Sequence, residues 1–338
     1  MPAPAARSRL PLLALVLLLA AALVATCTRT DPDGALVEGP RQAPAATGTT
    51  TAPPPTTALA VPPTPPPSGP GALITPAGIV VPVVSRTDAG WTVTTPCNRA
   101  ATLTDGTHVP AASIVLDAGH GGTDPGAVSP GGLAEKGINV LVQGHAKAAL
   151  ERAGVSVLVT RTADYDLELA VRAQIAKAVN ARAFVSIHHN AEPDGPWPGP
   201  GSETYYQIGS SDSKRLAGLI YEEIVRALSR FSVAWVADRD AGAKYRPGRR
   251  GDYYAVLRQP APVVSVLVEF AFISNPSEAE LIAQAEVQRL EGEALARGII
   301  RYLTTPDPGS GFVEPYPRPD PPGVGTPGTP PRCADPAF

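Results

Sequence analysis

The chain of 338 residues has few aromatic residues (5%), three cysteines and one methionine. Its formal net charge is only −3 at pH 7, so it lacks the positive excess that attracts nucleic acid, and we expect no nucleic-acid partner. Its charge-free apolar run, residues 10–25, is shorter than the ~20 residues of a membrane-spanning helix and contains Pro11. These shortages argue against a nucleic-acid binder and against a transmembrane anchor.

Proline is abundant by contrast, and its placement divides the chain. Of 40 prolines, twelve lie in residues 31–70 and eleven in residues 305–338. These stretches hold few branched apolar or aromatic side chains, and burial there cannot offset the entropy lost on ordering. We therefore expect a disordered, extended spacer over residues 28–71 and a proline-rich tail over residues 305–338. About 230 residues remain, enough for one core domain and a small appendage.

The first 27 residues have the pattern of an export signal. Arg7 and Arg9 precede the apolar run, and the run ends at Val24-Ala25-Thr26-Cys27. This ending resembles the bacterial lipoprotein cleavage box, although Thr26 stands where Gly, Ala or Ser is usual. Cleavage with lipid on Cys27 and plain cleavage both stay open. We expect export to the cell envelope, a periplasm-like space or the extracellular space, with membrane contact only through a lipid at Cys27.

The other two cysteines, Cys97 and Cys333, can pair in such an oxidising compartment. A bond between them would tie the proline-rich tail back to the folded part. The alternative is a pair of free thiols, and we favour the disulfide.

The folded part divides into two regions. Residues 72–112 offer two β-like pieces around Asp88-Ala89-Gly90, which predicts a small β-hairpin appendage. Residues 113–304 alternate all-apolar runs with segments of helical spacing, the last helix beginning at Asn275-Pro276 and running to about residue 303. This alternation predicts an α/β fold, a mainly parallel twisted sheet with helices on both faces. The apolar runs are residues 114–116, 155–159, 183–187 and 263–268.

Chemistry-bearing side chains follow the predicted strands. Ligands of such sheets bind outside the carboxyl ends of the strands, where His120, the pair His188-His189, and Glu269 stand. Glu135 begins the first helix and so returns to the same edge. The set His120, Glu135 and His188 has the two-histidine, one-carboxylate composition of a catalytic zinc site with an open position, and Glu269 could move a proton. Alternation sends His188 and His189 to opposite faces, so only one can be a ligand, and spacing does not say which.

Five stretches together resemble the zinc-dependent N-acetylmuramoyl-L-alanine amidases of bacterial cell-wall metabolism. The resemblance covers residues 113–304 in the family's order. It implies that the zinc ligands are His120, Glu135 and His188, and that Glu269 is the catalytic carboxylate. Two departures, Ala118 for the usual Pro and His189 for a small residue, remove no ligand. The stretches are IVLDAGHGGTDPG (114–126), Glu135 with Asn139, Thr160-Arg161 with Asp164 and Arg172, FVSIHHNA (184–191) and VLVEFAFISNP (266–276).

The resemblance also implies the reaction, which is hydrolysis of the amide between N-acetylmuramic acid and L-alanine in peptidoglycan or muropeptides, for wall remodelling or recycling. Two alternatives share the fold or the metal: a non-catalytic wall-binding regulator, and a zinc peptidase that cuts within the stem peptide. We expect the chain to act as a monomer. The polar segment 238–252 holds Arg249 and Arg250, which we expect, together with Asn190, to contact the substrate, the arginines through stem-peptide carboxylates.

Overall fold

The computed structural model describes residues 60–191, 201–235, 241–315 and 333–338. The expected export signal, Cys27 and most of the expected spacer lie outside these residues, as do residues 238–240 of the polar segment 238–252. No helix in the part that is described has the length and apolar character to cross a membrane. The elements in chain order are β1 (Ala72–Ile74), β2 (Val80–Thr87), β3 (Gly90–Thr94), β4 (Ala100–Leu103), β5 (Thr107–Val109), β6 (Ile114–Ala118), α1 (Glu135–Arg152), β7 (Val157–Val159), α2 (Leu169–Ala178), β8 (Ala183–Asn190), β9 (Glu203–Tyr206), α3 (Ser211–Leu228), β10 (Ala243–Lys244), β11 (Pro247–Gly248), β12 (Gly251–Asp252), α4 (Ala255–Arg258), β13 (Val264–Phe272), α5 (Pro276–Ile282) and α6 (Ala285–Thr304).

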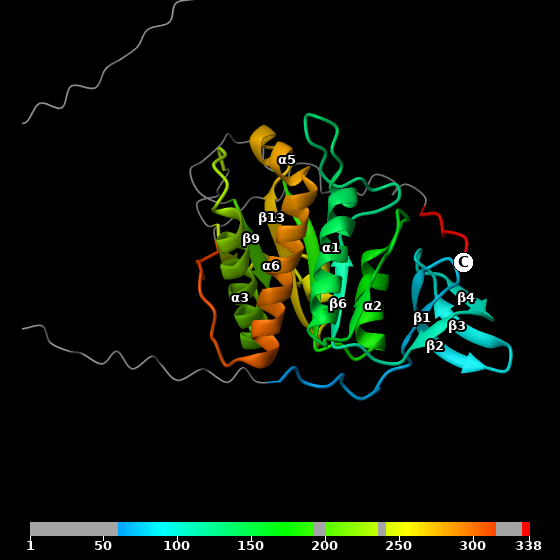
Figure 1. Cartoon of the computed structure of the whole chain (residues 1–338). Helices are drawn as coiled ribbons and strands as arrows, with labels where there is room; N and C mark the ends of the chain where they lie inside the picture. The colour runs from blue at the N-terminus through cyan, green and yellow to red at the C-terminus, as the bar shows by residue number, and fades with distance from the viewer. Residues whose placement is uncertain (1–59, 192–200, 236–240, 316–332) are drawn as a thin grey trace, which may run out of the picture. The chain divides into compact units, whose positions relative to one another are not determined.

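A six-stranded sheet forms the centre of the fold (Figure 1). Its strand order is β10-β9-β13-β8-β6-β7, and every pairing is parallel except that of β13 with β9. Helices follow the strands as crossover connections, which is how parallel neighbours are joined. The mainly parallel α/β sheet predicted from the sequence is confirmed.

Strand alternation gives the sheet two covered faces. Leu116, Val185 and Val268 point to the face that α1, α3 and α6 cover. The residues that alternate with them, such as Phe184 and Leu267, point to the other face and pack with α2, α4 and the N-terminal strands. Because both faces are buried, most side chains of these strands are apolar, and the strands therefore stand out in the sequence as apolar runs.

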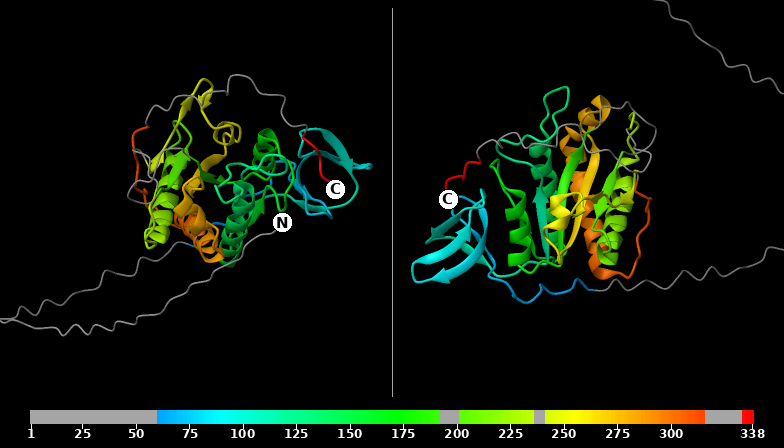
Figure 2. Two further views of the ribbon diagram at one scale, coloured as in Figure 1. Left: turned by 90° about the horizontal axis from the view of Figure 1, so that it is seen from above. Right: turned by 180° about the vertical axis from the view of Figure 1, so that it is seen from behind.

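The N-terminal appendage is a five-stranded antiparallel sheet of order β4-β3-β2-β1-β5. Its β2 and β3 are the predicted hairpin, joined at Asp88-Ala89. Three further strands extend this hairpin, and β2 packs against α2 (Figure 2). These added strands are only three or four residues long, and β4 alternates exposed with half-buried residues, so the sequence carries no strong apolar signal for them.

The structure differs from the sequence prediction for the end of the spacer. Residues 60–71 lie extended against the domain: the carbonyl of Pro63 accepts a hydrogen bond from Arg182 (3.1 Å), and that of Pro66 accepts one from Asn180 (3.0 Å). Gly71 N donates to the carbonyl of Ala178 (2.9 Å). Composition suggested disorder because few apolar groups are available here, but main-chain carbonyls that accept hydrogen bonds hold the segment instead.

The described parts of the tail are also attached. Phe312 bridges to Ala243 of β10, extending the sheet edge. Cys333 forms a disulfide with Cys97, with an S–S distance of 1.98 Å. Asp335 accepts hydrogen bonds from Cys97 N (2.8 Å) and from the Thr95 hydroxyl (3.0 Å). The tail is therefore anchored by a covalent bond and by polar contacts, which the proline count does not reveal.

The single helix expected at the end of the domain is two helices, α5 and α6. Asn275 caps α5 as expected, its side chain accepting from Ser277 N and Glu278 N, with Pro276 in the first turn. The break falls at Gln284, whose backbone is extended, and Gln288 donates its side-chain amide to the freed carbonyl of Ile282 (2.9 Å). The apolar spacing continues across this break, and so the sequence does not show it.

Candidate active site

Three side chains from three elements meet at the carboxyl edge of the sheet. His120 follows β6, Glu135 opens α1 and His188 lies near the end of β8, and each offers one ligand atom within 4.8 Å of the others. His120 Nε2 is 3.1 Å from Glu135 Oε2, and His188 Nδ1 is 3.0 Å from Glu135 Oε1. Three convergent nitrogen and oxygen donors suit a divalent cation such as zinc.

Two glycines make room for this group. A Cβ on Gly119 would stand 2.1 Å from the His188 ring, and one on Gly126 would stand 2.5 Å from Glu135 Oε2. Gly126 also has φ +69°, a conformation that side chains rarely adopt. The glycine-rich stretch after β6 is therefore required by the close approach of the histidine and the carboxylate.

The backbone of His120 is held in an unusual conformation. Its φ of 63° lies in the left-handed region, which is uncommon outside glycine. Arg172 donates to the carbonyl of His120 (2.7 Å), and Arg161 donates to the carbonyls of Ala118 (2.9 Å) and Gly119 (2.9 Å). The two arginines therefore fix the loop that presents His120.

Asp117 holds Arg172 in the position from which it bonds the His120 loop. It is fully buried, and it accepts hydrogen bonds from Arg172 (2.8 Å), Thr160 (2.6 Å) and Ser186 (2.7 Å). Burial would raise the pKa of Asp117, but the charge of Arg172 and these hydrogen bonds outweigh burial and lower it. Because the unfolded carboxyl titrates near ~3.9, ionised Asp117 stabilises the fold at neutral pH, and that contribution is lost as the pH falls through the lowered pKa.

We expect Arg172→Met to lower the free energy of unfolding by about 3 to 5 kcal/mol, because it leaves the buried carboxylate of Asp117 without its cation. Urea unfolding at pH 7 measures this loss. Lys147→Met is the matched control: it breaks the exposed pair with Glu151 and should change stability by less than about 0.5 kcal/mol. Equal losses of unfolding free energy in the two variants would show that the buried pair contributes no more to stability than the exposed pair.

Asp124 orients the His120 ring and is a site residue that sequence reasoning missed. Its Oδ2 lies 2.8 Å from Nδ1 of His120, leaving Nε2 directed at Glu135. Burial lowers the pKa of His120, but hydrogen bonds to Asp124 and Glu135 outweigh burial and raise it to about 10. A carboxylate behind a ligating histidine fixes its orientation and increases its basicity.

Glu135 is buried and strongly bonded. Its oxygens accept hydrogen bonds from the backbone of Ala127 (2.9 Å) and of His189 (3.1 Å). Burial would raise its pKa, but hydrogen bonds to His120 and His188 outweigh burial and lower it well below the ordinary range. Glu135 is therefore ionised, which is the form that binds a metal.

The two adjacent histidines have different environments. His188 belongs to the three-residue group, whereas His189 is buried on the other face of the sheet. There, His189 Nδ1 lies 2.8 Å from the Asn139 side chain, and Nε2 lies 3.4 Å from Glu291 Oε2. The structure thus brings His188, and not His189, into the group with His120 and Glu135.

Glu269 of β13 stands beside this group. It is the register partner of His188 on β8, so the two side chains lie on the same face in neighbouring strands. Its Oε2 is buried and has no hydrogen-bond partner among the residues described. Burial, together with the negative charges of Glu135 and Glu203, raises the pKa of Glu269 well above its ordinary value. A carboxylate with a raised pKa is a stronger base than an ordinary glutamate, which suits it to take up a proton and release it again.

A second buried carboxylate lies on the strand next to Glu269. Glu203 of β9 pairs in register with Glu269 and is fully buried. It accepts hydrogen bonds from Lys244, from Asn190 (2.6 Å) and from the Tyr205 hydroxyl (3.0 Å). Sequence reasoning missed Glu203 because β9 is short and antiparallel.

The residues predicted to bind substrate, Asn190, Arg249 and Arg250, lie in two different places in the structure. The Asn190 side chain is bonded to Glu203, and Lys244 is buried against the same carboxylate. Arg249 and Arg250 are exposed at the turn between β11 and β12. Their contact with stem-peptide carboxylates stays a prediction.

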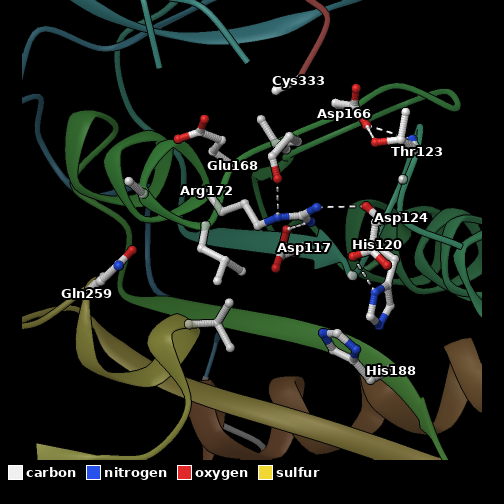
Figure 3. Close-up of a pocket in the computed structure, with 16 residues that line it drawn as sticks. Asp117, His120, Thr123, Asp124, Asp166, Glu168, Arg172, His188, Gln259 and Cys333 are labelled. Carbon is white, nitrogen blue, oxygen red and sulfur yellow. Dashed lines mark hydrogen bonds and ion pairs between the residues drawn. The ribbon is translucent and has the colours of Figure 1, made fainter. Parts of the chain in front are cut away.

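A cavity of about 710 Å³ opens beside the histidines (Figure 3). The stretch from residue 166 to Arg172, including the first turn of α2, lines it, as do Val256 and Gln259 at α4. His120, His188 and Asp117 line the part nearest the sheet, and Cys333 of the tail also reaches it. The candidate metal group is therefore accessible to a ligand of substantial size.

Comparisons with known proteins find relatives that are similar in sequence and in fold. An uncharacterised protein, YqiI, of Bacillus subtilis (strain 168) is 35% identical over 209 residues, spanning 61% of this chain and 90% of that protein. The germination-specific N-acetylmuramoyl-L-alanine amidase of the same organism is 30% identical over 207 residues, 56% of this chain and 79% of that protein. The solved structure of Cwp6 from Clostridium difficile matches with a TM-score of 0.50 and 29% identity, over 59% of this chain and 31% of that one.

The family assignment rests on a match over more than half of the chain. Residues 114–301, more than half of the 338, match the family model described as N-acetylmuramoyl-L-alanine amidase. This range contains all three residues of the candidate metal group, together with Glu269. The chain therefore belongs to the N-acetylmuramoyl-L-alanine amidase (Amidase_3) family of enzymes.

Proposed function

We propose that the chain is a zinc-dependent hydrolase that opens the amide bond between N-acetylmuramic acid and L-alanine in peptidoglycan or muropeptides. The observation that carries this proposal is Glu269, placed in register beside His188 with a buried oxygen that has no partner among the described residues. A carboxylate adjacent to a two-histidine, one-carboxylate group is the arrangement that hydrolysis of an amide needs.

The donor set fits zinc. His120, Glu135 and His188 would hold the ion, and two histidines with one carboxylate leave a coordination position for water or substrate. When bound, zinc polarises a carbonyl and makes a coordinated water more acidic. Asp124 behind His120, and the backbone donors on Glu135, hold two of the three ligands in place.

Glu269 would carry the proton in this reaction. Its raised pKa lets it accept a proton from the attacking water and deliver that proton to the nitrogen of the departing L-alanine. Glu203 places a second negative charge beside it, and the ion pair of Glu203 with Lys244 offsets part of that charge. Arg161 and Arg172 keep the loop of His120 in place while the substrate exchanges.

The substrate of this reaction lies outside the cytoplasm, which agrees with the export signal expected over residues 1–27. The lipid at Cys27 stays a prediction, because that segment is outside the described residues. The monomeric state also stays a prediction.

The test uses purified muropeptides, with the protein stripped by a chelator and then restored with zinc. We expect zinc-loaded protein to release stem peptides with a free L-alanine amino terminus, and stripped protein to release none. Mass spectrometry of the products identifies the bond that opens.

Other outcomes would support the alternatives. A cut between two amino acids of the stem would indicate a zinc peptidase. Binding of muropeptide by zinc-loaded protein without any cleavage would indicate a wall-binding regulator. Cleavage that persists at an undiminished rate without metal would contradict the proposed zinc dependence.

A further inference from the structure

The cavity beside the metal group reaches a segment that the family match does not include. Its lining contains His120 and His188, and it also contains Cys333, which lies beyond the matched residues 114–301. Figure 3 shows Cys333 and His188 on opposite sides of the group of side chains that line this cavity. Part of the binding surface is therefore built by this chain's own C-terminal extension.

The C-terminal extension is held in place where it lines the cavity. Besides the Cys97–Cys333 disulfide, Ala334 N donates to Asp166 Oδ2 (3.1 Å). Asp166 also accepts from the backbone and the hydroxyl of Thr123 (2.6 and 2.7 Å), in the loop after His120. The carboxylate of Asp166 therefore links the tail to the loop that carries His120. This link fixes the position of the tail relative to the metal group.

The rest of the cavity lining has a distinct chemistry, and Figure 3 shows Glu168, Gln259 and Cys333 on the side away from His188. Leu169, 50% exposed at the start of α2, and Val256 of α4 offer apolar surface. Glu168 and Asp166 contribute carboxylates, and Gln259 Oε1 has no hydrogen-bond partner within the described ranges. Apolar patches, carbonyl and carboxylate acceptors together suit a ligand with many O–H and N–H donors.

The same lining disfavours an anionic ligand. Arg172 is the only lysine or arginine among the described residues that line the cavity. Its guanidinium is already bonded to Asp117 and to the carbonyls of Ala118 and His120. Asp166 and Glu168 form no ion pair within the described ranges, so their negative charges would repel stem-peptide carboxylates but not a neutral sugar.

We propose that this far side, lined by Leu169, Gln259 and Cys333, is a saccharide subsite, and that the C-terminal segment 333–338 is one of its walls. This inference rests on the proposed function, because the saccharide is the sugar that precedes the muramoyl unit in the glycan. The subsite adds binding energy remote from the bond that opens, and we expect it to lower KM without changing kcat.

The test compares two muropeptides with the same stem peptide, one carrying the disaccharide and one carrying N-acetylmuramic acid alone. Full-chain, zinc-loaded Leu169→Ser should raise KM for the disaccharide substrate about five-fold and leave kcat unchanged, because a hydrophobic contact with the sugar ring is lost. For the single-sugar substrate, KM should stay at the wild-type value. Leu141→Ser is the matched control, since Leu141 is 51% exposed on α1 and does not line the cavity.

The wall itself is tested by the double variant Cys97→Ser/Cys333→Ser, with thermal unfolding and zinc content measured in parallel. We expect a similar rise in KM confined to the disaccharide substrate, with zinc retained. An effect that is equal for both substrates, that follows the length of the stem peptide, or that is absent in both Leu169→Ser and the double variant overturns the subsite. If the wild type cleaves neither substrate, the proposed function fails, and the subsite that depends on it fails with it.

Discussion

Glu269→Gln should lower kcat by about a hundred- to ten-thousand-fold while the protein keeps its full zinc content. Glutamine has nearly the same shape as glutamate but cannot take up and return a proton. No residue in the described part of the chain is hydrogen-bonded to Glu269 Oε2, so no bonded neighbour is in place to carry the proton instead. The side chain points from β13 to the same face as His188, but it is not one of the three convergent ligands. Steady-state cleavage of muropeptides and metal analysis of the same sample provide the two measurements.

Glu280→Gln is the control for this prediction. Glu280 is exposed on α5, and the same chemical change there should alter neither kcat nor zinc content. If Glu269→Gln retained most of the wild-type kcat, another group would have to carry the proton. A loss of zinc together with activity would instead make Glu269 part of the metal site.

His120→Ala should abolish stoichiometric zinc binding and with it the cleavage of muropeptides, matching the activity of chelator-treated protein. The substitution removes one of three convergent donors and leaves the buried Glu135 short of a partner. Asp124→Asn should have a graded effect: the ring stays, but its orienting charge is lost, and zinc affinity should fall about 10- to 100-fold. Competition with a chelator of known affinity measures both variants.

His145→Ala is the control for the ligand substitution, because His145 lies on α1 and contributes nothing to the three-residue group. It should retain zinc and activity. A His120→Ala protein that is folded and still binds one zinc tightly would contradict the ligand assignment.

The location of the site could be predicted from the sequence because topology determines it. Parallel strands buried on both faces are apolar runs, and their carboxyl ends fall at one edge, so His120 and Glu269 could be assigned to that edge without a structure. The period-two rule also predicted that His188 and His189 face opposite sides. It could not show which histidine joins Glu135. Helix α1 covers the face of His189, yet Glu135 at the start of α1 lies 3.0 Å from His188 on the other face.

The residues that support the site are those that the sequence did not reveal. Asp124 lies in an irregular loop, and Glu203 lies on a four-residue strand that pairs antiparallel with β13. Lys244, in the polar segment 238–252, is buried against Glu203. Polar pairing of this kind depends on contacts between segments about 40 residues apart, which hydrophobic periodicity does not encode.

The proline-rich segments show the limit of an argument from composition. Low apolar content correctly indicated that neither stretch forms a core, but it gave no account of polar anchors. Pro63 and Pro66 are held through their carbonyls, and Cys333 is held through a disulfide. The predicted Cys97–Cys333 disulfide is present and ties the tail back to the folded part, and Cys333 also contributes to a wall of the cavity.

The most direct measurement of the central claim is hydrolysis of a defined muropeptide by the zinc-loaded full chain in water enriched in heavy oxygen. The account predicts that the label enters the lactyl carboxyl group of N-acetylmuramic acid, while the released stem peptide carries a free L-alanine amine and no label. Label in a carboxyl group of a stem-peptide fragment, or the absence of any labelled product from zinc-loaded protein, would contradict it.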